Sequence, residues 1–253
     1  MQREIFFHLN SHKIFFWLFI VAFLLQIFFW QESTKNYKAE VELVPPAPNK
    51  YIRSALSLGD EEFLFRILGT RLQNSGDVFA GFVALKKYDY SRIYDWMKSL
   101  DELNYESNFI PSLASYYYSQ TQHRPDSKYI IDYLDEHASR DLDKKWWWMF
   151  QAVFVAKKSL RDNDVAYDLA YKLSKNKSKS APLWTKHLHA NISKEQGDDC
   201  LSFRILKNLI KDIQDGKEKA SIEELNYMRF YINERLVSLK KNNFNPKKCL
   251  SQS

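Results

Sequence analysis

The chain has 253 residues, of which 45% are apolar, so it is long and apolar enough to bury a sizeable core. It contains only six glycines and seven prolines, which excludes a turn-rich β-sandwich and favours an all-α fold. The formal net charge is +6, but lysines and acids are interspersed along most of the sequence, which indicates a solvated surface and no nucleic-acid partner.

The first element is an apolar segment of seventeen residues, Ile14 to Trp30, whose one polar side chain is Gln26. As a helix it spans roughly 25 Å, and Trp17 and Trp30 suit the two membrane interfaces. The segment is longer and more aromatic than the core of a signal peptide, and no A-x-A-like cleavage site follows it. We therefore predict a single transmembrane helix; a cleaved signal peptide and a buried core helix are the alternatives.

Basic residues flank this segment on both sides, with Arg3 and Lys13 before it and Lys35 and Lys38 after it. The slight positive excess on the short tail, residues 1–13, predicts a cytoplasmic N-terminus. The C-terminal domain then lies across the membrane, in the periplasm for a bacterial inner-membrane protein.

Residues 31–49 are predicted to be a linker, because the stretch from Val44 to Pro48 contains three prolines and cannot be helical. It is either an extended spacer or an extended arm packed on the domain.

From residue 50 to 240 apolar side chains recur at helical spacing, which predicts eight or nine helices joined by short turns. Asp60 and Asn108 are predicted N-caps, and Ser221 with Glu224 forms a capping box. The predicted helical segments are 61–72, 90–103, 109–118, 126–137, 146–154, 165–173, 183–188, 201–210 and 222–239. Residues 241–253 are predicted to be a basic C-terminal tail.

An internal comparison supports pairing of these helices with a period of 34 residues, the length of a tetratricopeptide repeat. The matched positions are Asn163 and Asp164 with Gly197 and Asp198, Phe150 with Trp184, and Ala166 with Cys200. The turn at Asp89 lies 37 residues before the turn at Asp126, which lies 38 residues before Asp164, so the predicted array is irregular.

The stretch from Leu103 to Pro111, LNYESNFIP, resembles the junction between consecutive tetratricopeptide repeats. Residues 50–240 as a whole are similar to bacterial membrane-anchored, tetratricopeptide-like proteins. The resemblance implies an irregular α-α superhelix of three to five helical hairpins. The chain lacks the Trp-Leu-Gly-Tyr set of the repeat consensus in one helix, and no functional residues carry over.

No catalytic, cofactor-binding or metal-binding site is predicted. Neither GxGxxG nor GxxxxGK[ST] occurs, and GxSxG is also missing. His187 and His189 diverge on a helix and lack a third ligand. Adjacent carboxylates at 61, 62, 101 and 102 are interpreted as solvated surface groups, because neighbouring helix positions point apart.

The two cysteines, Cys200 and Cys249, form no CxxC motif, which excludes a zinc ribbon or a disulfide scaffold. They can pair if the domain faces an oxidising compartment, but nothing in the sequence brings them within bridging distance.

Two lysine runs could contact phosphates or anionic lipid, although solvated faces are the favoured interpretation. They are Lys172, Lys175, Lys177 and Lys179, and Lys240, Lys241, Lys247 and Lys248.

Runs of aromatic residues occur at 116–118 and 146–148. Three consecutive helix positions cover about 200° of arc, so at least one ring of each run faces away from the main core. Packing between neighbouring helices is favoured over a peptide-binding groove, since stacked repeats bury their inner helices on two sides.

The predicted function is a non-enzymatic, membrane-anchored scaffold that binds a protein partner and no small molecule. Residues assigned to its binding face are Arg92, Tyr116, Tyr117, Lys128 and Trp147. The alternatives are a membrane-associated enzyme with an all-helical domain, such as a cell-envelope hydrolase, and a passive subunit of a membrane complex.

Overall fold

The computed structural model describes residues 2–35, 42–76, 83–242 and 246–251, and every regular element in these ranges is helical. This confirms the predicted all-α fold. The chain divides into two compact units, residues 1–42 and residues 43–253.

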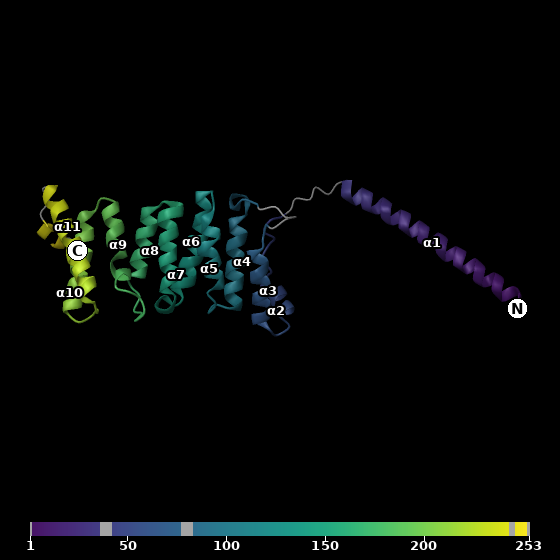
Figure 1. The fold of residues 1–253 in the computed structure, drawn as a ribbon, viewed down its shortest axis with the longest axis horizontal. Helices are drawn as coiled ribbons and strands as arrows, with labels where there is room; N and C mark the ends of the chain where they lie inside the picture. Colours follow the sequence, from purple (N-terminus) through teal and green to yellow (C-terminus); the bar gives the residue numbers. More distant parts are fainter. Residues whose placement is uncertain (1, 36–41, 77–82, 243–245, 252–253) are drawn as a thin grey trace. The chain divides into compact units, whose positions relative to one another are not determined.

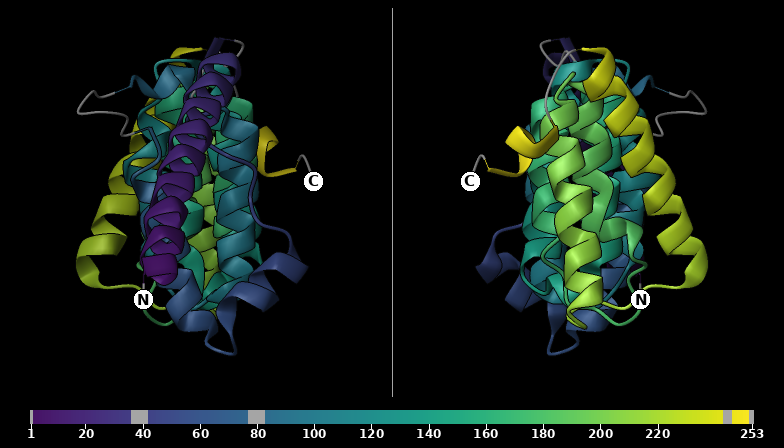
Figure 2. Two further views of the ribbon diagram at one scale, coloured as in Figure 1. Left: turned by 90° about the vertical axis from the view of Figure 1, so that its right-hand side faces the viewer. Right: turned by 90° about the vertical axis from the view of Figure 1, so that its left-hand side faces the viewer.

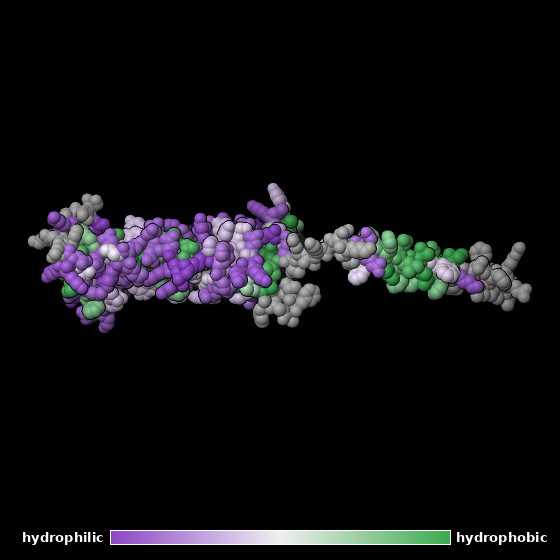
Figure 3. Space-filling model, turned by 90° about the horizontal axis from the view of Figure 1, so that it is seen from above, coloured by the Kyte–Doolittle hydropathy of each residue, from purple (hydrophilic) through white to green (hydrophobic). Residues whose placement is uncertain are grey.

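The first unit contains one helix, α1 (Gln2–Lys35). Within it the window Lys13–Glu32 is long and apolar enough to cross a membrane, and none of that window is buried. At 1.5 Å per residue its twenty residues match a hydrocarbon core of about 30 Å. Figure 3 shows the apolar side chains as a green band around the middle of the helix. The predicted segment, Ile14 to Trp30, lies inside this window, but the helix continues through residues 31–35, which the sequence had assigned to the linker.

The second unit is a row of helices that lie side by side in chain order (Figure 1). They are α2 (Lys50–Ser57), α3 (Glu61–Gln73), α4 (Tyr90–Leu103), α5 (Phe109–Tyr116), α6 (Ser127–Ser139), α7 (Leu142–Val155), α8 (Asn163–Leu173), α9 (Trp184–Glu195), α10 (Asp199–Gln214), α11 (Ile222–Lys241) and α12 (Pro246–Ser251). Short 3₁₀ turns occupy Leu85–Lys87, Tyr118–Gln120 and Arg124–Asp126, and a π turn, Ala156–Leu160, extends α7.

Each helix from α2 to α11 packs against the next one along the chain. In addition, α4 contacts α6 and α5 contacts α7, so alternate helices form two rows. The end views in Figure 2 show that most of these helices share a common direction, whereas α11 is tilted. The elements are therefore stacked helical hairpins, α4–α5, α6–α7, α8–α9 and α10–α11.

An aspartate precedes the first helix of each hairpin: Asp89, Asp126, Asp162 and Asp198, at intervals of 37, 36 and 36 residues. Except at Asp126, the carboxylate accepts hydrogen bonds from backbone N–H groups of the first turn. Such caps stabilise a helix by about 1 kcal/mol. The 34-residue alignment was wrong in register, because it matched Asp198 with Asp164, which lies inside the first turn of α8.

Gly197 lies in the short turn between α9 and α10. Its φ of +88° lies in the left-handed region, which side chains with a Cβ rarely adopt. The N–H of Gly197 donates to the carbonyl of Lys194, and the N–H of Asp198 donates to that of Ser193. The turn therefore satisfies carbonyls at the end of α9 and places the Asp198 cap at the start of α10.

One large apolar cluster runs from the start of the second unit to α9, and two smaller clusters lie between α9 and α12. Fully buried members of the large cluster include Leu72, Ile93, Leu100, Leu134, Met149 and Leu173. Burial of one such side chain contributes about 1.5–3 kcal/mol. Phe63 and Ile67 of the predicted apolar face of α3 are exposed, while the neighbouring Phe65 is buried.

The proline-rich segment before α2 is packed on the domain and is not a free spacer. Val44 is buried, and its carbonyl accepts a hydrogen bond from Arg92 Nη1 at 2.9 Å. The Pro45 carbonyl accepts another from Trp96 Nε1 at 2.7 Å. The prolines prevent this segment from forming a helix, so its carbonyls lack helical hydrogen-bond partners, and the two side chains of α4 donate to them instead.

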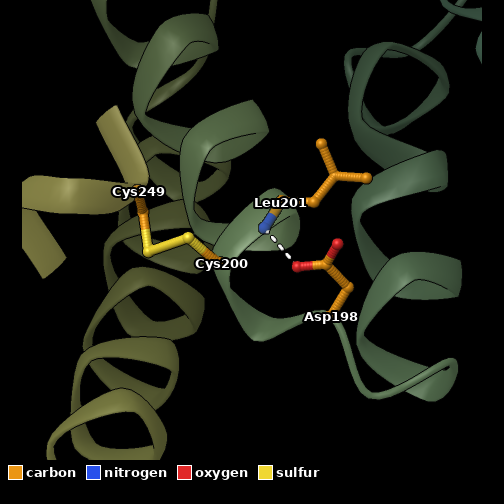
Figure 4. Close-up of a disulfide and its surroundings, with 4 residues drawn as sticks. All are labelled: Asp198, Cys200, Leu201 and Cys249. Atoms are coloured by element: carbon orange, nitrogen blue, oxygen red, sulfur yellow. Dashed lines mark hydrogen bonds between the residues drawn. A yellow bond between two sulfur atoms is a disulfide. The ribbon is translucent and has the colours of Figure 1, made fainter. Parts of the chain in front are cut away.

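The segment predicted as a basic tail contains α12, which packs against α10 and α11. Cys249 of α12 is fully buried and forms a disulfide with Cys200 of α10 (Figure 4). Their Cα atoms are 5.2 Å apart, within the usual range for a bridge. The pairing that the sequence left open is therefore present in the structure.

Candidate functional site

Aromatic side chains from three alternate helices meet on the surface of the second unit. They are Tyr116 of α5, Trp146, Trp147 and Phe150 of α7, and Trp184 of α9, and we call them the aromatic strip. Because α5, α7 and α9 are the second helices of consecutive hairpins, stacking the hairpins places these residues next to one another.

The strip is continuous from α5 to α9. Trp147 Nε1 donates a hydrogen bond to the Tyr116 hydroxyl at 3.1 Å. The ring centroids of Trp147 and Phe150 are 5.4 Å apart, and those of Phe150 and Trp184 are 4.8 Å apart. Trp146 completes the set, with its centroid 5.7 Å from that of Trp147 and 6.2 Å from that of Trp184. These spacings are typical of interacting aromatic pairs.

Helical geometry explains why three consecutive tryptophans have three environments. Trp148 is buried, and its Nε1 donates to Asn108 Oδ1 at 3.0 Å. Trp147, about 100° further round α7, is 39% exposed, and Trp146 is half-buried. The interpretation of core packing is therefore right for Trp148, whereas Trp147 faces the surface together with Tyr116, which is 55% exposed.

Of the five residues assigned to the binding face, Tyr116 and Trp147 contact each other. Tyr117 is exposed, and its ring packs against Tyr118, 5.0 Å between centroids. Lys128 is an exposed residue in the first turn of α6. Arg92 binds the Val44 carbonyl, so it holds the N-terminal arm in place.

A buried polar network between α4 and α6 was missed from the sequence. Asp101 is only 3% exposed. Its carboxylate accepts a hydrogen bond from the Tyr133 hydroxyl at 2.8 Å, lies 2.6 Å from His137 Nδ1, and pairs with Arg140. The interpretation of Asp101 as a solvated surface group was wrong. The burial of Asp101 could have been predicted from the sequence, because Asp101 lies four residues after Met97 and eight after Ile93, on the buried face of α4.

Burial affects the protonation and the hydrogen bonding of the residues around Asp101. Burial, followed by the nearby Asp101 carboxylate, raises the pKa of Tyr133 well above its usual value, so the phenol stays protonated. The His137 ring is fully buried, and its Nε2 has no hydrogen-bond partner among the described residues. The network joins α4 to α6 through these contacts, and it lines a hollow of about 350 Å³.

Two further histidines, His187 and His189, are buried on α9. Burial lowers the pKa of both, that of His189 to about 4, so they are neutral at pH 7. In the part of the chain that the structure describes, no three His, Cys, Asp or Glu side chains are grouped as metal ligands.

Comparison with known proteins does not assign the chain to a family. No protein-family model matches it, and no match is found among curated proteins or among solved structures. The resemblance to tetratricopeptide-like proteins accordingly stays an expectation from the sequence, and the site is interpreted from its own chemistry.

Proposed function

We propose that this protein is a membrane-anchored scaffold that binds another protein on the aromatic strip. The observation that carries the proposal is the exposure of Trp147 and Tyr116 at the α5 end of a continuous row of rings. Tryptophan and tyrosine dominate the binding energy of protein interfaces, because they bury a large apolar area with few rotatable bonds. A row of such rings, three of which belong to α7, is suited to binding a protein.

The stacked hairpins support a scaffold of the tetratricopeptide type. In arrays of this kind each hairpin contacts its neighbours and adds one helix to an extended binding surface. The aromatic strip follows this arrangement, since it takes residues from the second helix of three consecutive hairpins. A partner segment lying across α5, α7 and α9 would contact all three.

We further propose that α1 anchors the scaffold in a membrane. Its apolar side chains are exposed throughout the window Lys13–Glu32, and lipid would cover them. The Cys200–Cys249 disulfide favours an oxidising compartment for the helical unit. With a cytoplasmic N-terminus, that compartment is the periplasm of a bacterial inner-membrane protein.

The topology is tested by cysteine labelling after whole cells are precipitated with acid and denatured. We expect Cys200 and Cys249 to resist a thiol-reactive polyethylene glycol until the denatured protein is reduced. Full labelling without a reductant would place the helical unit in a reducing compartment and contradict the proposed orientation.

The binding role is tested by co-purification of the full-length protein in a mild detergent, with partners identified by mass spectrometry. We expect the wild type to retain one partner. Recovery of that partner should fall by about tenfold or more in the double variant Trp147→Ala, Trp184→Ala. The control is Phe230→Ala, which removes an exposed ring of α11 outside the strip. Equal partner recovery from the strip variant, with unchanged helix content, would reject the strip as the binding surface.

A further inference from the structure

The loop between α8 and α9, residues 174–183, borders both the aromatic strip and a second surface feature. Residues of the loop also line a hollow of about 460 Å³, which we call the lysine hollow. Its charged lining residues are Lys177, Lys179, Lys186, Lys217, Lys219 and Glu218, and Leu183 lies at its apolar base.

Five lysines and one glutamate line the hollow. Lys186 pairs with Glu218 at 3.1 Å, and Lys217 pairs with Asp212 at 2.9 Å. The other three, Lys177, Lys179 and Lys219, are exposed and form no ion pair within the described ranges. The hollow therefore presents a local positive potential that favours an anionic group.

The loop is fixed to the helix that carries the strip. Trp146 Nε1 donates to Ser180 Oγ at 3.3 Å, and the backbone N–H of Lys177 donates to Asp143 Oδ1 at 2.6 Å. Asp143 lies in the first turn of α7, three residues before Trp146. The ring surface and the positive hollow are thus adjoining parts of one surface.

We infer that this surface binds an acidic segment of the partner protein, whose apolar side chains pack on the aromatic strip while its carboxylates enter the lysine hollow. This inference rests on the proposed scaffold function and specifies the chemistry of the partner. Exposed lysine ammonium groups attract carboxylates as point charges without requiring one fixed geometry. That property suits a flexible acidic segment.

The packing of the rings favours a peptide over a nucleic acid or a sugar. Bases of single strands stack on open ring faces. Three ring pairs of the strip pack edge to face, with interplanar angles of 89° for Trp146 and Trp147, 75° for Trp146 and Trp184, and 66° for Phe150 and Trp184, and the pair of Trp147 and Phe150 is tilted at 47°. A ring whose face meets the edge of a neighbour offers less of that face for stacking, whereas the side chains of a peptide can pack between the rings.

The test measures binding of a fluorescently labelled random copolymer of glutamate and tyrosine to the full-length protein in neutral detergent. A random copolymer is used because it samples many acidic sequences and does not depend on knowing the partner. We expect binding that weakens as salt is raised and that falls by about tenfold in Lys177→Gln, Lys179→Gln, Lys219→Gln. The matched control, Lys211→Gln, Lys240→Gln, Lys241→Gln, makes the same change in net charge elsewhere and should change binding by less than about twofold.

Each outcome decides for or against the acidic segment. Binding that depends on the hollow lysines and on Trp147 supports it. No binding, or equal losses in the two triple variants, overturns it. Stronger hollow-dependent binding of inorganic polyphosphate, or of vesicles rich in phosphatidylglycerol, would replace the acidic protein by a phosphate-bearing ligand. If the charge variants have no effect but Trp147→Ala still releases the co-purified partner, the scaffold function stands and the acidic chemistry alone fails.

Discussion

The two ends of the helical unit are stabilised differently. From α3 to α8 a single large apolar cluster fills the space between helices, and alternate helices contact each other. From α9 to α12 the apolar clusters are small, and polar side chains are buried between them. The buried polar residues of this part are Thr185, His187, His189, Ser193, Ser202 and Arg235.

Both regions bury polar side chains, among them Asp101 and His137 of the α3–α8 region, but most of the large apolar cluster lies in that region. In the α9–α12 region, specific polar bonds and a disulfide join the helices. Arg235 is 1% exposed, and its Nε donates to Ser202 Oγ at 3.0 Å. Its guanidinium lies 5.4 Å from the centroid of the Tyr231 ring. The Cys200–Cys249 disulfide then joins α10 to α12. The comparison indicates that the α9–α12 region opens before the α3–α8 region, because few large apolar side chains oppose its opening.

The largest expected effect comes from truncating the large cluster. Leu134 of α6 is fully buried, and Leu134→Ala should lower the free energy of unfolding by about 2–5 kcal/mol through lost burial and a residual cavity. Denaturant titration followed by circular dichroism measures this change. The control, Leu56→Ala, removes the same atoms from a side chain that is 53% exposed and should cost less than about 1 kcal/mol. Equal losses in both variants would contradict the packing of the α3–α8 region.

The disulfide should stabilise only its own end of the row. Replacing both Cys200 and Cys249 by serine is expected to cost about 2–4 kcal/mol. Hydrogen exchange should accelerate in α10, α11 and α12 and stay unchanged in α4 to α7. Faster exchange along the whole row would show that the two regions unfold together and would remove the distinction between them.

A smaller effect is expected at the buried network of the apolar region. Asp101→Asn removes the charge that Arg140 and His137 contact, and it should lower stability by about 1–3 kcal/mol. Asp95→Asn, on the exposed side of the same helix, should be close to neutral. Thermal unfolding of the two variants measures the difference, and a neutral Asp101 variant would mean that the network does not join α4 to α6.

The smallest expected effect is a pH dependence that arises from a buried histidine of the α9–α12 region. Burial holds the pKa of His189 near 4 in the folded state, below its unfolded value of about 6.5. The unfolded chain therefore binds more protons between these values, so stability is complete above about pH 6.5 and falls as the pH drops toward 4. Between pH 7 and pH 5 the loss is at most about 2 kcal/mol. His189→Gln should flatten the profile, measured by denaturant titration at each pH, and an unchanged slope would assign the dependence to other groups.

Local signals located nine helices of the second unit, from α3 to α11, but α2 and α12 were not predicted. The segment predicted at 90–103 coincides with α4, and the capping box of Ser221 and Glu224 begins α11. Burial of the 43–49 arm depends on Arg92 and Trp96, which lie more than forty residues away, so no local pattern reveals it. The same reason hid the packing of α12.

The candidate site was only partly predictable. Tyr116 and Trp147 stood out because each belongs to a run of aromatics that cannot all face the core. Phe150 and Trp184 were interpreted only as matching positions of a repeat, since they become neighbours through the stacking of α7 on α9. The Asp89–Asp126–Asp162–Asp198 spacing was also present in the sequence, but the two aspartates at 162 and 164 left its register ambiguous.

Site-specific photo-crosslinking in intact membranes tests the central claim most directly. A photoreactive phenylalanine analogue is placed at position 147 of the strip or, as the control, at position 230 of α11, where Phe230 is 65% exposed. We predict one discrete protein adduct from position 147, none from position 230, and loss of the adduct when Trp184→Ala is added. Equal crosslinking from both positions, or an adduct that survives Trp184→Ala unchanged, would contradict a protein-binding aromatic strip.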